Sequence, residues 1–295
     1  MTADDVLAYR KGFLKIPGWF TLTDLLVFDA VTDQINSGSE PGNFLELGVL
    51  AGKSGAFLSR KVRPNNRVYL CDLFDLEANE VSNRFEVRAS YGTVSYARAE
   101  ANLKEFGNIE RASLLVTHSS QVGQVVSDRN ISLIHVDASH IHPYIGQDLD
   151  LALRELLSDD GWLVVDDYRT FHATAVAEAF WNRVGDGRLF PVVLTETKAY
   201  CRRPESNDAA TRLEFKSRME SLGLTVQEVS AQCGTIWRVE APLVKQPYRR
   251  PRRFQSRVFV RNPLERFILS MAGRAKRTMS QSNTGNFPTL LRRDG

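Results

Sequence analysis

Carboxylates and an imidazole stand at the ends of two apolar segments of this 295-residue chain. Asp137 ends the segment ISLIHVD, His140 follows three residues later, and Asp166 and Asp167 end the segment GWLVVDD. If the two segments are neighbouring strands, about 4.8 Å apart, their terminal carboxylates converge. Converging carboxylates repel and raise one another's pKa unless a cation lies among them. Oxygen ligands suit Mg²⁺, with Mn²⁺ and Ca²⁺ as alternatives, so the pattern predicts a metal site at Asp137, Asp166 and Asp167.

The histidine beside this predicted metal site is of the residue type that moves protons. An ordinary imidazole titrates close to neutral pH, which suits a group that takes a proton from a hydroxyl. A metal ion at the neighbouring carboxylates would bind substrate hydroxyls and lower the pKa of one of them. We therefore predict His140 as the catalytic base, with His142 as the alternative. For both histidines a hydrogen-bonded structural role is the competing interpretation.

A glycine-containing loop follows an earlier apolar segment, NFLELG. Its sequence GVLAGKS resembles a phosphate-binding loop but has three residues between the glycines instead of four, and Glu46 would direct a negative charge toward the phosphates. The G-x-G-x-x-G pattern of dinucleotide-binding loops is absent as well. A ligand with a ribose and no phosphates fits better, because Gly48 and Gly52 let the backbone approach it and Asp72 can accept hydrogen bonds from both ribose hydroxyls. S-adenosylmethionine (SAM) is such a ligand, with a sulfonium cation and an amino-acid group that acidic side chains favour.

Each of these loop residues also has a purely structural interpretation. Glycines at a strand-to-helix turn are often only turn residues, and an aspartate at a strand end is often only a cap. Because successive strand ends all offer groups that suit one ligand, we predict a SAM site there. The cofactor-binding residues predicted on strands one, two and four are Glu46, Gly48, Gly52, Ser54, Asp72 and Asp137.

The elements that must position these residues alternate along the chain between short apolar runs and helical patterns. This alternation predicts a doubly wound α/β fold, with a mostly parallel sheet that helices cover on both faces and ligands beyond the carboxyl ends of the strands. LFPVVLTETKAYCR predicts two further strands joined by a tight turn at Glu196 and Thr197, which gives the sheet an antiparallel ending. The predicted strands are 43–48, 67–72, 112–117, 131–137 and 161–167, and the predicted helices are 53–62, 94–107, 145–157 and 171–184.

Charge divides the chain into an acidic body and a basic tail. The whole chain carries +3, and residues 241–295 hold 13 lysines and arginines against two acids, so residues 1–240 carry −8. We predict a helical N-terminal lid segment (1–38) that contains an amphipathic helix at Thr21–Ile35. A SAM-binding domain (39–240) follows, with an accessory helix and strands within 204–240. The remainder (241–295) is predicted to be a partly disordered basic extension.

The basic extension contains a segment with helical periodicity. Within 263–277, Leu264, Phe267, Ile268 and Met271 recur at helical spacing among arginines and lysines, which predicts a basic amphipathic helix. Three interpretations stay open: packing on the domain or on a sister subunit of a homo-oligomer, peripheral contact with a membrane surface, and nucleic-acid binding. Nucleic acid is the least favoured, because aromatic residues are few there and no recognition module is visible.

Two further features bear on location. No apolar run approaches the roughly 18 residues of a transmembrane helix. The three cysteines are widely spaced and match no disulfide or zinc pattern. We therefore expect a cytoplasmic protein, with association at the membrane surface left open by the basic tail.

Several longer motifs resemble those of one enzyme family. FLELGVLAGKSG, VYLCDLFD, HVDASHIHPYIGQDLDLALRELLSDDGWLVVDDY and TKAYC are similar to successive motifs of class I SAM-dependent methyltransferases, which have a Rossmann-like fold. In particular they resemble the metal-dependent sugar O-methyltransferases of antibiotic biosynthesis (macrocin and mycinamicin type) and the related cephalosporin-hydroxylase group. The similarity spans about residues 40–202, and 131–168 is its specific part.

The resemblance assigns roles to individual residues. It implies that Asp137, Asp166 and Asp167 are Mg²⁺ ligands, and that His140 is the base of the mycinamicin-type enzymes. Other members have D-G-D where this chain has Asp137-Ala138-Ser139, so the second aspartate that serves as base in some of them is absent. The resemblance also implies that N-terminal helices close the site, with the aromatic residues of Tyr9–Phe20 facing an acceptor. Finally, it implies that Ser119, Ser120 and Gln121 contact the adenine of the cofactor.

Together these observations predict a Mg²⁺-dependent SAM O-methyltransferase that acts on a hydroxyl. The expected acceptor is a small molecule or saccharide, most simply a sugar in a glycosylated metabolite, glycolipid or polysaccharide. Two alternatives are an RNA methyltransferase that uses the basic tail, and a non-catalytic protein of the same fold that binds SAM or a nucleotide.

Overall fold

The computed structural model describes residues 4–40, 42–77, 84, 95–126 and 130–241. The chain divides into two compact units, Met1–Tyr248 and Arg249–Gly295. The second unit lies outside the described residues, and so do the predicted helix at 263–277 and nearly all of the predicted basic extension. The described residues thus belong to the first unit, and the three-part division of the chain stays a prediction.

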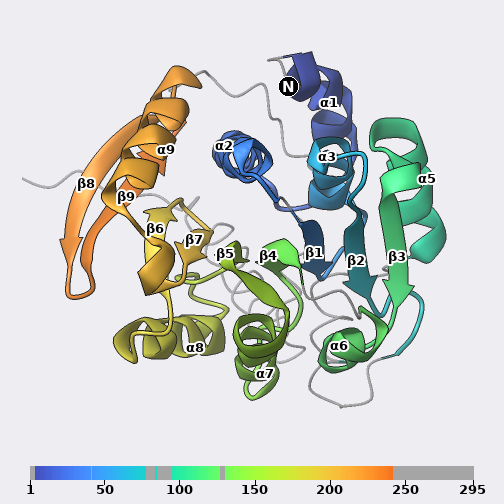
Figure 1. Ribbon diagram of the computed structural model, residues 1–295. Helices are drawn as coiled ribbons and strands as arrows, with labels where there is room; N and C mark the ends of the chain where they lie inside the picture. The colour runs from blue at the N-terminus through green and yellow to red at the C-terminus, as the bar shows by residue number, and fades with distance from the viewer. Residues whose placement is uncertain (1–3, 41, 78–83, 85–94, 127–129, 242–295) are drawn as a thin grey trace, which may run out of the picture. The chain divides into compact units, whose positions relative to one another are not determined.

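The first unit is built on one nine-stranded mixed sheet with the order β3-β2-β1-β4-β5-β7-β6-β9-β8 (Figure 1). Strands β1 to β5 are mutually parallel, β7 runs antiparallel to both β5 and β6, and β8 runs antiparallel to β9. The strand bounds are β1 Asn43–Leu47, β2 Val68–Asp72, β3 Ala112–Val116, β4 Ile131–Val136, β5 Leu157–Val165, β6 Phe190–Leu194, β7 Ala199–Arg202, β8 Thr225–Ala231 and β9 Gly234–Glu240. The predicted doubly wound α/β fold is confirmed.

Helices cover both faces of this sheet. Figure 1 shows α1, α2, α3, α5 and α9 on one face and α6, α7 and α8 on the other. Their bounds are α1 Asp4–Lys15, α2 Leu22–Ser37, α3 Lys53–Lys61, α5 Tyr96–Phe106, α6 Val122–Val125, α7 Tyr144–Leu151, α8 Thr174–Gly185 and α9 Ala209–Ser221. Because β1 and β4 lie between two helical layers, every one of their side chains is buried. This burial explains why both strands are continuous apolar runs rather than alternating ones.

The sheet separates two hydrophobic cores. On the α2 side, Phe28, Phe57 and Phe215 belong to one buried cluster, and Phe20 meets Phe28 edge to face at 5.1 Å between ring centroids. On the α7 side, Leu149 and Phe180 belong to the second cluster. The two cores hold the strands in register, so the ends of the parallel strands form a rigid edge.

The strand that follows the predicted helix 145–157 begins earlier than predicted. The α-helix α7 ends at Leu151 and the chain continues as a π-helical turn, Ala152–Leu156, so helical conformation ends within one residue of the prediction. Strand β5 begins at Leu157 rather than at Gly161. The register between β4 and β5 shifts between Ile131 and Leu133, so the first residues of β5 form an irregular extension that the apolar pattern did not indicate.

The predicted turn at Glu196 and Thr197 is confirmed by a hydrogen bond from the Thr195 amide to the Lys198 carbonyl, 2.9 Å long. The sheet does not stop at β6 and β7, however. Strand β9 adds alongside β6, and α9 packs beneath this extension through Phe215, whose ring lies 4.9 Å from that of Trp162. The accessory residues 204–240 thus lengthen the sheet.

Within the described residues, no helix is long and apolar enough to cross a membrane.

Candidate active site

The carboxyl ends of β1, β2, β4 and β5 meet at one edge of the sheet, on either side of the point where the strand order reverses. Chains that leave β1 and β4 there diverge to opposite faces of the sheet, which opens a space for ligands. The predicted site residues of β1, β2, β4 and β5 are all delivered to this edge.

The glycine loop after β1 is fixed by the carboxylate that ends β2. Asp72 Oδ2 accepts hydrogen bonds from the backbone amides of Val49 (2.7 Å) and Leu50 (2.9 Å), and its Oδ1 accepts one from the Phe74 amide (3.0 Å). A carboxylate has about four acceptor positions, so these bonds leave about one for a ribose hydroxyl. Asp72 therefore positions the loop, and its predicted contact with the ribose stays a prediction.

Gly48 is required by a close approach between two strand ends. It has φ +88°, and a Cβ built on it would lie 2.0 Å from the carbonyl oxygen of Asp137. The residue lets the end of β1 lie directly against the end of β4, which brings Asp137 beside the loop. Gly52, at φ +78°, begins α3 in the left-handed conformation, and its Cβ would meet nothing closer than 3.6 Å. Gly52 is therefore required for its backbone conformation, whereas Gly48 is required because a side chain would have no space.

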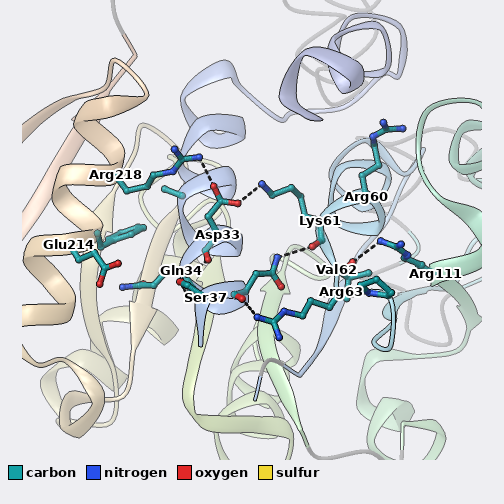
Figure 2. A pocket seen from close by; sticks show the side chains of 14 residues that line it. Asp33, Gln34, Ser37, Arg60, Lys61, Val62, Arg63, Arg111, Glu214 and Arg218 are labelled. Atoms are coloured by element: carbon teal, nitrogen blue, oxygen red, sulfur yellow. Dashed lines mark hydrogen bonds and ion pairs between the residues drawn. The ribbon is translucent and has the colours of Figure 1, made fainter. Parts of the chain in front are cut away.

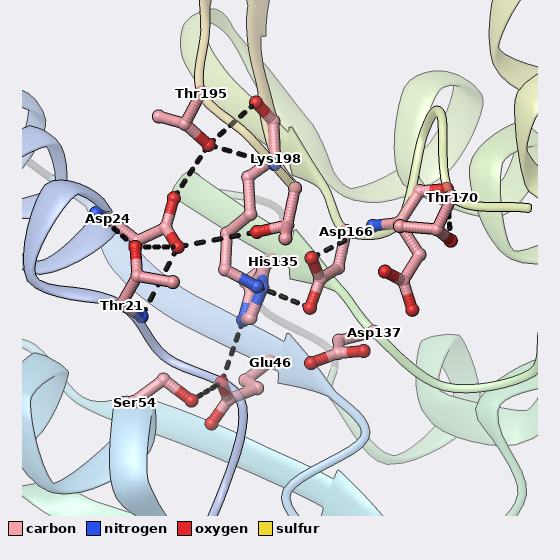
Figure 3. Close-up of polar contacts among 12 residues, drawn as sticks. Thr21, Asp24, Glu46, Ser54, His135, Asp137, Asp166, Thr170, Thr195 and Lys198 are labelled. Carbon is pink, nitrogen blue, oxygen red and sulfur yellow. Dashed lines mark hydrogen bonds and ion pairs between the residues drawn. The ribbon is translucent and has the colours of Figure 1, made fainter. Parts of the chain in front are cut away.

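A buried lysine lies among the acidic side chains at this edge (Figure 3). Lys198, which is 1% exposed, pairs through Nζ with Asp166 Oδ2. Burial alone would lower the pKa of Lys198, but the charges of Asp166, Asp137 and Asp24 outweigh burial and raise that pKa. Within the described residues, the ammonium group of Lys198 is thus a cation that balances part of the negative charge of these carboxylates.

Asp24 joins this cluster from α2. Its Oδ1 accepts hydrogen bonds from the hydroxyls of Thr195 (2.7 Å) and Tyr200 (3.2 Å), and its side chain also closes a capping box with Thr21 at the start of α2. The N-terminal segment is therefore anchored to the β6–β7 turn through a fully buried carboxylate.

A second buried group lies on β1 and β4, behind the carboxylates. Glu46 Oε1 lies 2.8 Å from His135 Nδ1 and accepts a hydrogen bond from the Ser54 hydroxyl. Burial raises the pKa of Glu46 to about 8, and burial together with the charge of Lys198 lowers the pKa of His135 to about 3. Both shifts favour the uncharged form of the side chain. Glu46 and Ser54 bind each other in the interior, and their predicted contact with the cofactor stays a prediction.

One group of side chains at this edge has the geometry of a metal site. Within the described residues, the ligand atoms of His135, Asp137 and Asp166 all lie within 4.8 Å of one another. The Nε2 atom of His135 is buried and has no hydrogen-bond partner among the described residues. Burial and the neighbouring Asp166 raise the pKa of Asp137 well above its ordinary value. A buried imidazole nitrogen without a partner in the described part of the chain, beside two carboxylates, is a group of potential ligands that a divalent cation fits.

Asp167, the third predicted metal ligand, faces the histidines instead. The residue has φ +56°, and its Oδ2 lies 3.2 Å from His140 Nε2 and 3.4 Å from His172 Nε2. Burial opposes ionisation of Asp167, but the hydrogen bond and charge of His140 and the charge of His172 outweigh it and lower its pKa. His140 is itself buried, and its Nε2 is also 3.8 Å from Asp137 Oδ1. The structure thus places the predicted base between two predicted metal ligands.

The predicted adenine-contacting residues form a short helical turn, Ser119–Gln121, after β3. His118 caps this turn, since its Nδ1 accepts from the Ser120 amide at 3.2 Å. Asp148 on α7 is buried, and burial raises its pKa to about 6 although a hydrogen bond from Ser119 opposes the rise. The turn is therefore braced from α7, while its contact with adenine stays a prediction.

The aromatic residues of the N-terminal segment point into the core. Tyr9 is fully buried, donates a hydrogen bond to the Lys53 carbonyl and lies 5.5 Å from the Phe57 ring. Phe20 is also buried, and only Trp19, at 46% exposure, is strongly exposed. The expectation that the aromatic residues of Tyr9–Phe20 face an acceptor is therefore wrong for Tyr9 and Phe20, because their apolar rings gain more from packing on α3.

Sequence reasoning missed several residues of this site: Asp24, His135, Asp148, His172 and Lys198. The motif TKAYC contained Lys198, and a lysine inside a buried strand ending is a signal, because a buried ammonium requires carboxylate partners. His135 lies two residues before Asp137 and therefore on the same face of β4, which is a second usable signal. Asp24, Asp148 and His172 carry no such signal, because their positions depend on how distant elements pack.

A comparison with protein families finds a match in this part of the chain. The family described as "Methyltransferase domain" matches residues 45–168, which include the glycine loop, the β4 aspartate and the β5 aspartate pair. A comparison with curated protein sequences finds no match.

One solved structure, that of NovP, shows the same fold, and two others are similar to this chain. The O-methyltransferase NovP matches at 16% identity with a TM-score of 0.51, covering 63% of this chain and 83% of that chain. The SAH-bound methyltransferase PaMTH1 of Podospora anserina matches at 14% identity with a TM-score of 0.46, covering 69% and 88%. The calicheamicin methyltransferase CalS11 matches at 16% identity with a TM-score of 0.46, covering 68% and 92%. The resemblance to methyltransferases seen in the sequence agrees with these findings: residues 45–168 form a methyltransferase domain.

Proposed function

We propose that this methyltransferase transfers the methyl group of SAM to a hydroxyl oxygen of a sugar, with the help of a divalent cation, Mg²⁺ in the first instance. The observation that carries the proposal is the position of His140, whose Nε2 lies between the carboxylates of Asp167 and Asp137 at the carboxyl edge of the sheet. NovP, whose fold this chain shares, is described as an O-methyltransferase, which agrees with an oxygen acceptor.

The chemistry requires alignment and removal of one proton. The hydroxyl oxygen attacks the methyl carbon, the carbon–sulfur bond breaks with its electron pair going to sulfur, and S-adenosylhomocysteine (SAH) leaves. His140 takes the hydroxyl proton, and the adjacent Asp167 carboxylate stabilises the imidazolium that forms. The rigid strand edge holds the groups in line, which supplies the entropic part of the acceleration.

A divalent cation would be held by Asp137, Asp166 and Nε2 of His135. This set fits because the imidazole nitrogen is buried without a partner among the described residues, and mixed nitrogen and oxygen ligands suit Mn²⁺ as well as Mg²⁺. When bound, the cation would supply Lewis-acid polarisation of acceptor hydroxyls. Asp166 would then share its carboxylate between the cation and Lys198. The ligand role of Asp167 stays a prediction.

The sugar acceptor is supported by the residues around His140. His172 is 59% exposed and contacts Asp167, and the neighbouring Phe171 is 80% exposed with its ring 5.4 Å from that of His172. An exposed aromatic ring beside hydrogen-bonding groups suits a sugar, which has apolar ring faces and a polar rim. We also propose that the enzyme acts in the cytoplasm, as expected from its cysteines.

The first experiment is calorimetric titration of the full chain with SAM and SAH, followed by a methyl-transfer assay on a pooled set of glycosides with Mg²⁺, Mn²⁺ or EDTA. His140→Ala should lower turnover by about 10²-fold or more while the SAM dissociation constant stays within a few-fold. His142→Ala is the matched control, because His142 is exposed and should leave turnover unchanged.

The same assay tests whether turnover requires a divalent cation. Asp137→Asn should remove the dependence of turnover on added metal while SAM still binds. Full activity in EDTA would contradict the metal part of the proposal, and unchanged turnover in His140→Ala would move the base elsewhere. Binding of SAH with no methyl transfer to any glycoside would reject the sugar acceptor. The RNA methyltransferase alternative depends on residues outside the described part of the chain and stays a prediction.

A further inference from the structure

A cavity of about 790 Å³ lies away from the candidate active site, among α2, α3 and α9 (Figure 2). Residues from the carboxyl-terminal turns of α2 and α3 line it, and β1 and β2, which follow those helices, begin nearby. The cavity is therefore at the edge of the sheet opposite the glycine loop. Its volume is within the range of about 300–1,000 Å³ that is typical of small-molecule sites.

The lining of this cavity is rich in positive charge. Five basic residues line it against two acidic ones, Asp33 and Glu214. Two of the basic residues are already neutralised, since Lys61 lies 2.5 Å from Asp29 and 2.7 Å from Asp33, and Arg218 pairs with the same two carboxylates. The other three are Arg60, Arg63 and Arg111.

These three arginines have no carboxylate partner among the described residues. Arg63 donates through Nη2 to the Asn36 carbonyl, and Arg111 donates through Nη1 to the Val62 carbonyl at 3.0 Å. No hydrogen bond or ion pair of the Arg60 side chain occurs within the described part of the chain. Because each guanidinium has five N–H donors, most of their donors remain available to a ligand.

We propose that this cavity is a second binding site, for a small molecule that carries phosphate groups, such as a nucleotide or a sugar phosphate. Phosphate oxygens match the fork of N–H donors on an arginine and balance its charge. The site is separate from the catalytic edge, so its ligand binds independently of SAM. The inference does not depend on the identity of the methyl acceptor.

The test is calorimetric titration of the full chain with ADP and with inorganic pyrophosphate. Both should bind, since each offers phosphate groups to the arginines, and binding should weaken as salt is raised. Arg60→Gln should weaken ADP binding about tenfold, since it removes a charged donor. Its thermal unfolding should match that of the parent protein, because Arg60 has no partner to lose within the described residues.

Arg154→Gln is the matched control, an exposed arginine in the turn that continues α7 on the opposite face of the sheet. It should leave ADP binding unchanged, and SAH should bind equally well with and without saturating ADP. The proposal is overturned if neither probe binds at millimolar concentration, if Arg60→Gln binds ADP as tightly as the parent protein, or if ADP competes with SAH. Tight binding of an RNA oligomer with no ADP binding would also overturn it.

Discussion

Lys198 is the residue that most changes the electrostatics of the catalytic edge. Its ammonium group is buried against Asp166, and Asp137 and Asp24 contribute to its charge balance. A carboxylate repelled by its neighbours is stabilised by whichever cation is present, so a lysine and a metal ion act on the same group. Asp166 therefore keeps a defined position in the absence of metal.

Replacement of Lys198 should show how strongly the buried carboxylate of Asp166 depends on a neighbouring cation. Lys198→Met should lower the free energy of unfolding in EDTA by about 3–5 kcal/mol, because it leaves a buried carboxylate uncompensated. Mn²⁺ should restore part of the loss. Lys216→Met, which breaks an exposed pair with Glu228, is the control and should cost less than about 1 kcal/mol. Urea unfolding with and without metal measures both, and equal losses for the two variants would show that Lys198 does not hold Asp166.

Asp148 provides a pH-dependent test of burial beside the Ser119–Gln121 turn. Its pKa is raised from 3.8 to about 6, so the folded protein binds a proton more tightly there than the unfolded chain does. This contribution to stability is present below pH 3.8 and is lost as pH rises to about 6. Asp148→Asn, which mimics the protonated form, should therefore match the parent protein near pH 4 and exceed its unfolding free energy by roughly 2–3 kcal/mol at pH 7.5. A difference that does not change with pH would mean that Asp148 is not desolvated.

At the scale of elements, the glycine loop, the end of β2 and the end of β4 form one unit. Asp72 binds the loop amides, and Gly48 lets the loop lie on the backbone of Asp137. Because Asp137 is also a candidate metal ligand, the cofactor loop and the metal group share their backbone support. A change in this loop should therefore affect both parts of the site.

Gly48→Ala tests that coupling. A Cβ there would lie 2.0 Å from the Asp137 carbonyl oxygen, so the two strand ends must separate, and the left-handed φ adds strain of about 1 kcal/mol or more. We expect a loss of more than about 2 kcal/mol in unfolding free energy together with weaker SAM binding. Gly185→Ala at the end of α8 meets nothing within 4 Å and should be neutral or stabilise by about 0.5–1 kcal/mol. Normal SAM binding in Gly48→Ala would refute the close approach.

At the scale of the whole described unit, the sheet is longer than its methyltransferase core. The matched family ends at residue 168, whereas strands β6 to β9 and helix α9 continue the same sheet. Phe215 of α9 is 1% exposed and packs on Trp162 of β5, so the extension shares the hydrophobic core on the α2 side. We therefore expect one cooperative unfolding transition for this unit.

Phe215→Ala tests whether the extension unfolds together with the methyltransferase core. Removal of a buried phenylalanine should cost about 3–5 kcal/mol and shift the whole transition. Leu213→Ala on the same helix, at 65% exposure, should stay within about 0.5 kcal/mol of the parent protein. Differential scanning calorimetry distinguishes the outcomes: a separate early transition in Phe215→Ala would show that the extension folds independently of the core.

The sequence by itself determined the succession of strands and helices along the chain and the edge of the sheet at which the candidate site lies. Continuous apolar runs identify buried parallel strands, and a polar residue directly after such a run must lie at the carboxyl edge, so Asp72, Asp137 and Asp166 were placed correctly. The β6–β7 turn was equally local, since its hydrogen bond joins residues three apart. Local patterns were sufficient for prediction wherever the interacting residues lie close together in the sequence.

Only the tertiary structure decided which side chains meet at that edge. The register between β5 and β7 brings Lys198 to Asp166, the left-handed backbone at Asp167 turns it toward His140, and the packing of α2 supplies Asp24. The arginine-lined cavity likewise forms where α9 lies beside α2 and α3, which come much earlier in the chain. These contacts depend on how layers pack against each other, and the packing free energy is spread over many apolar residues, so no single stretch of sequence encodes it.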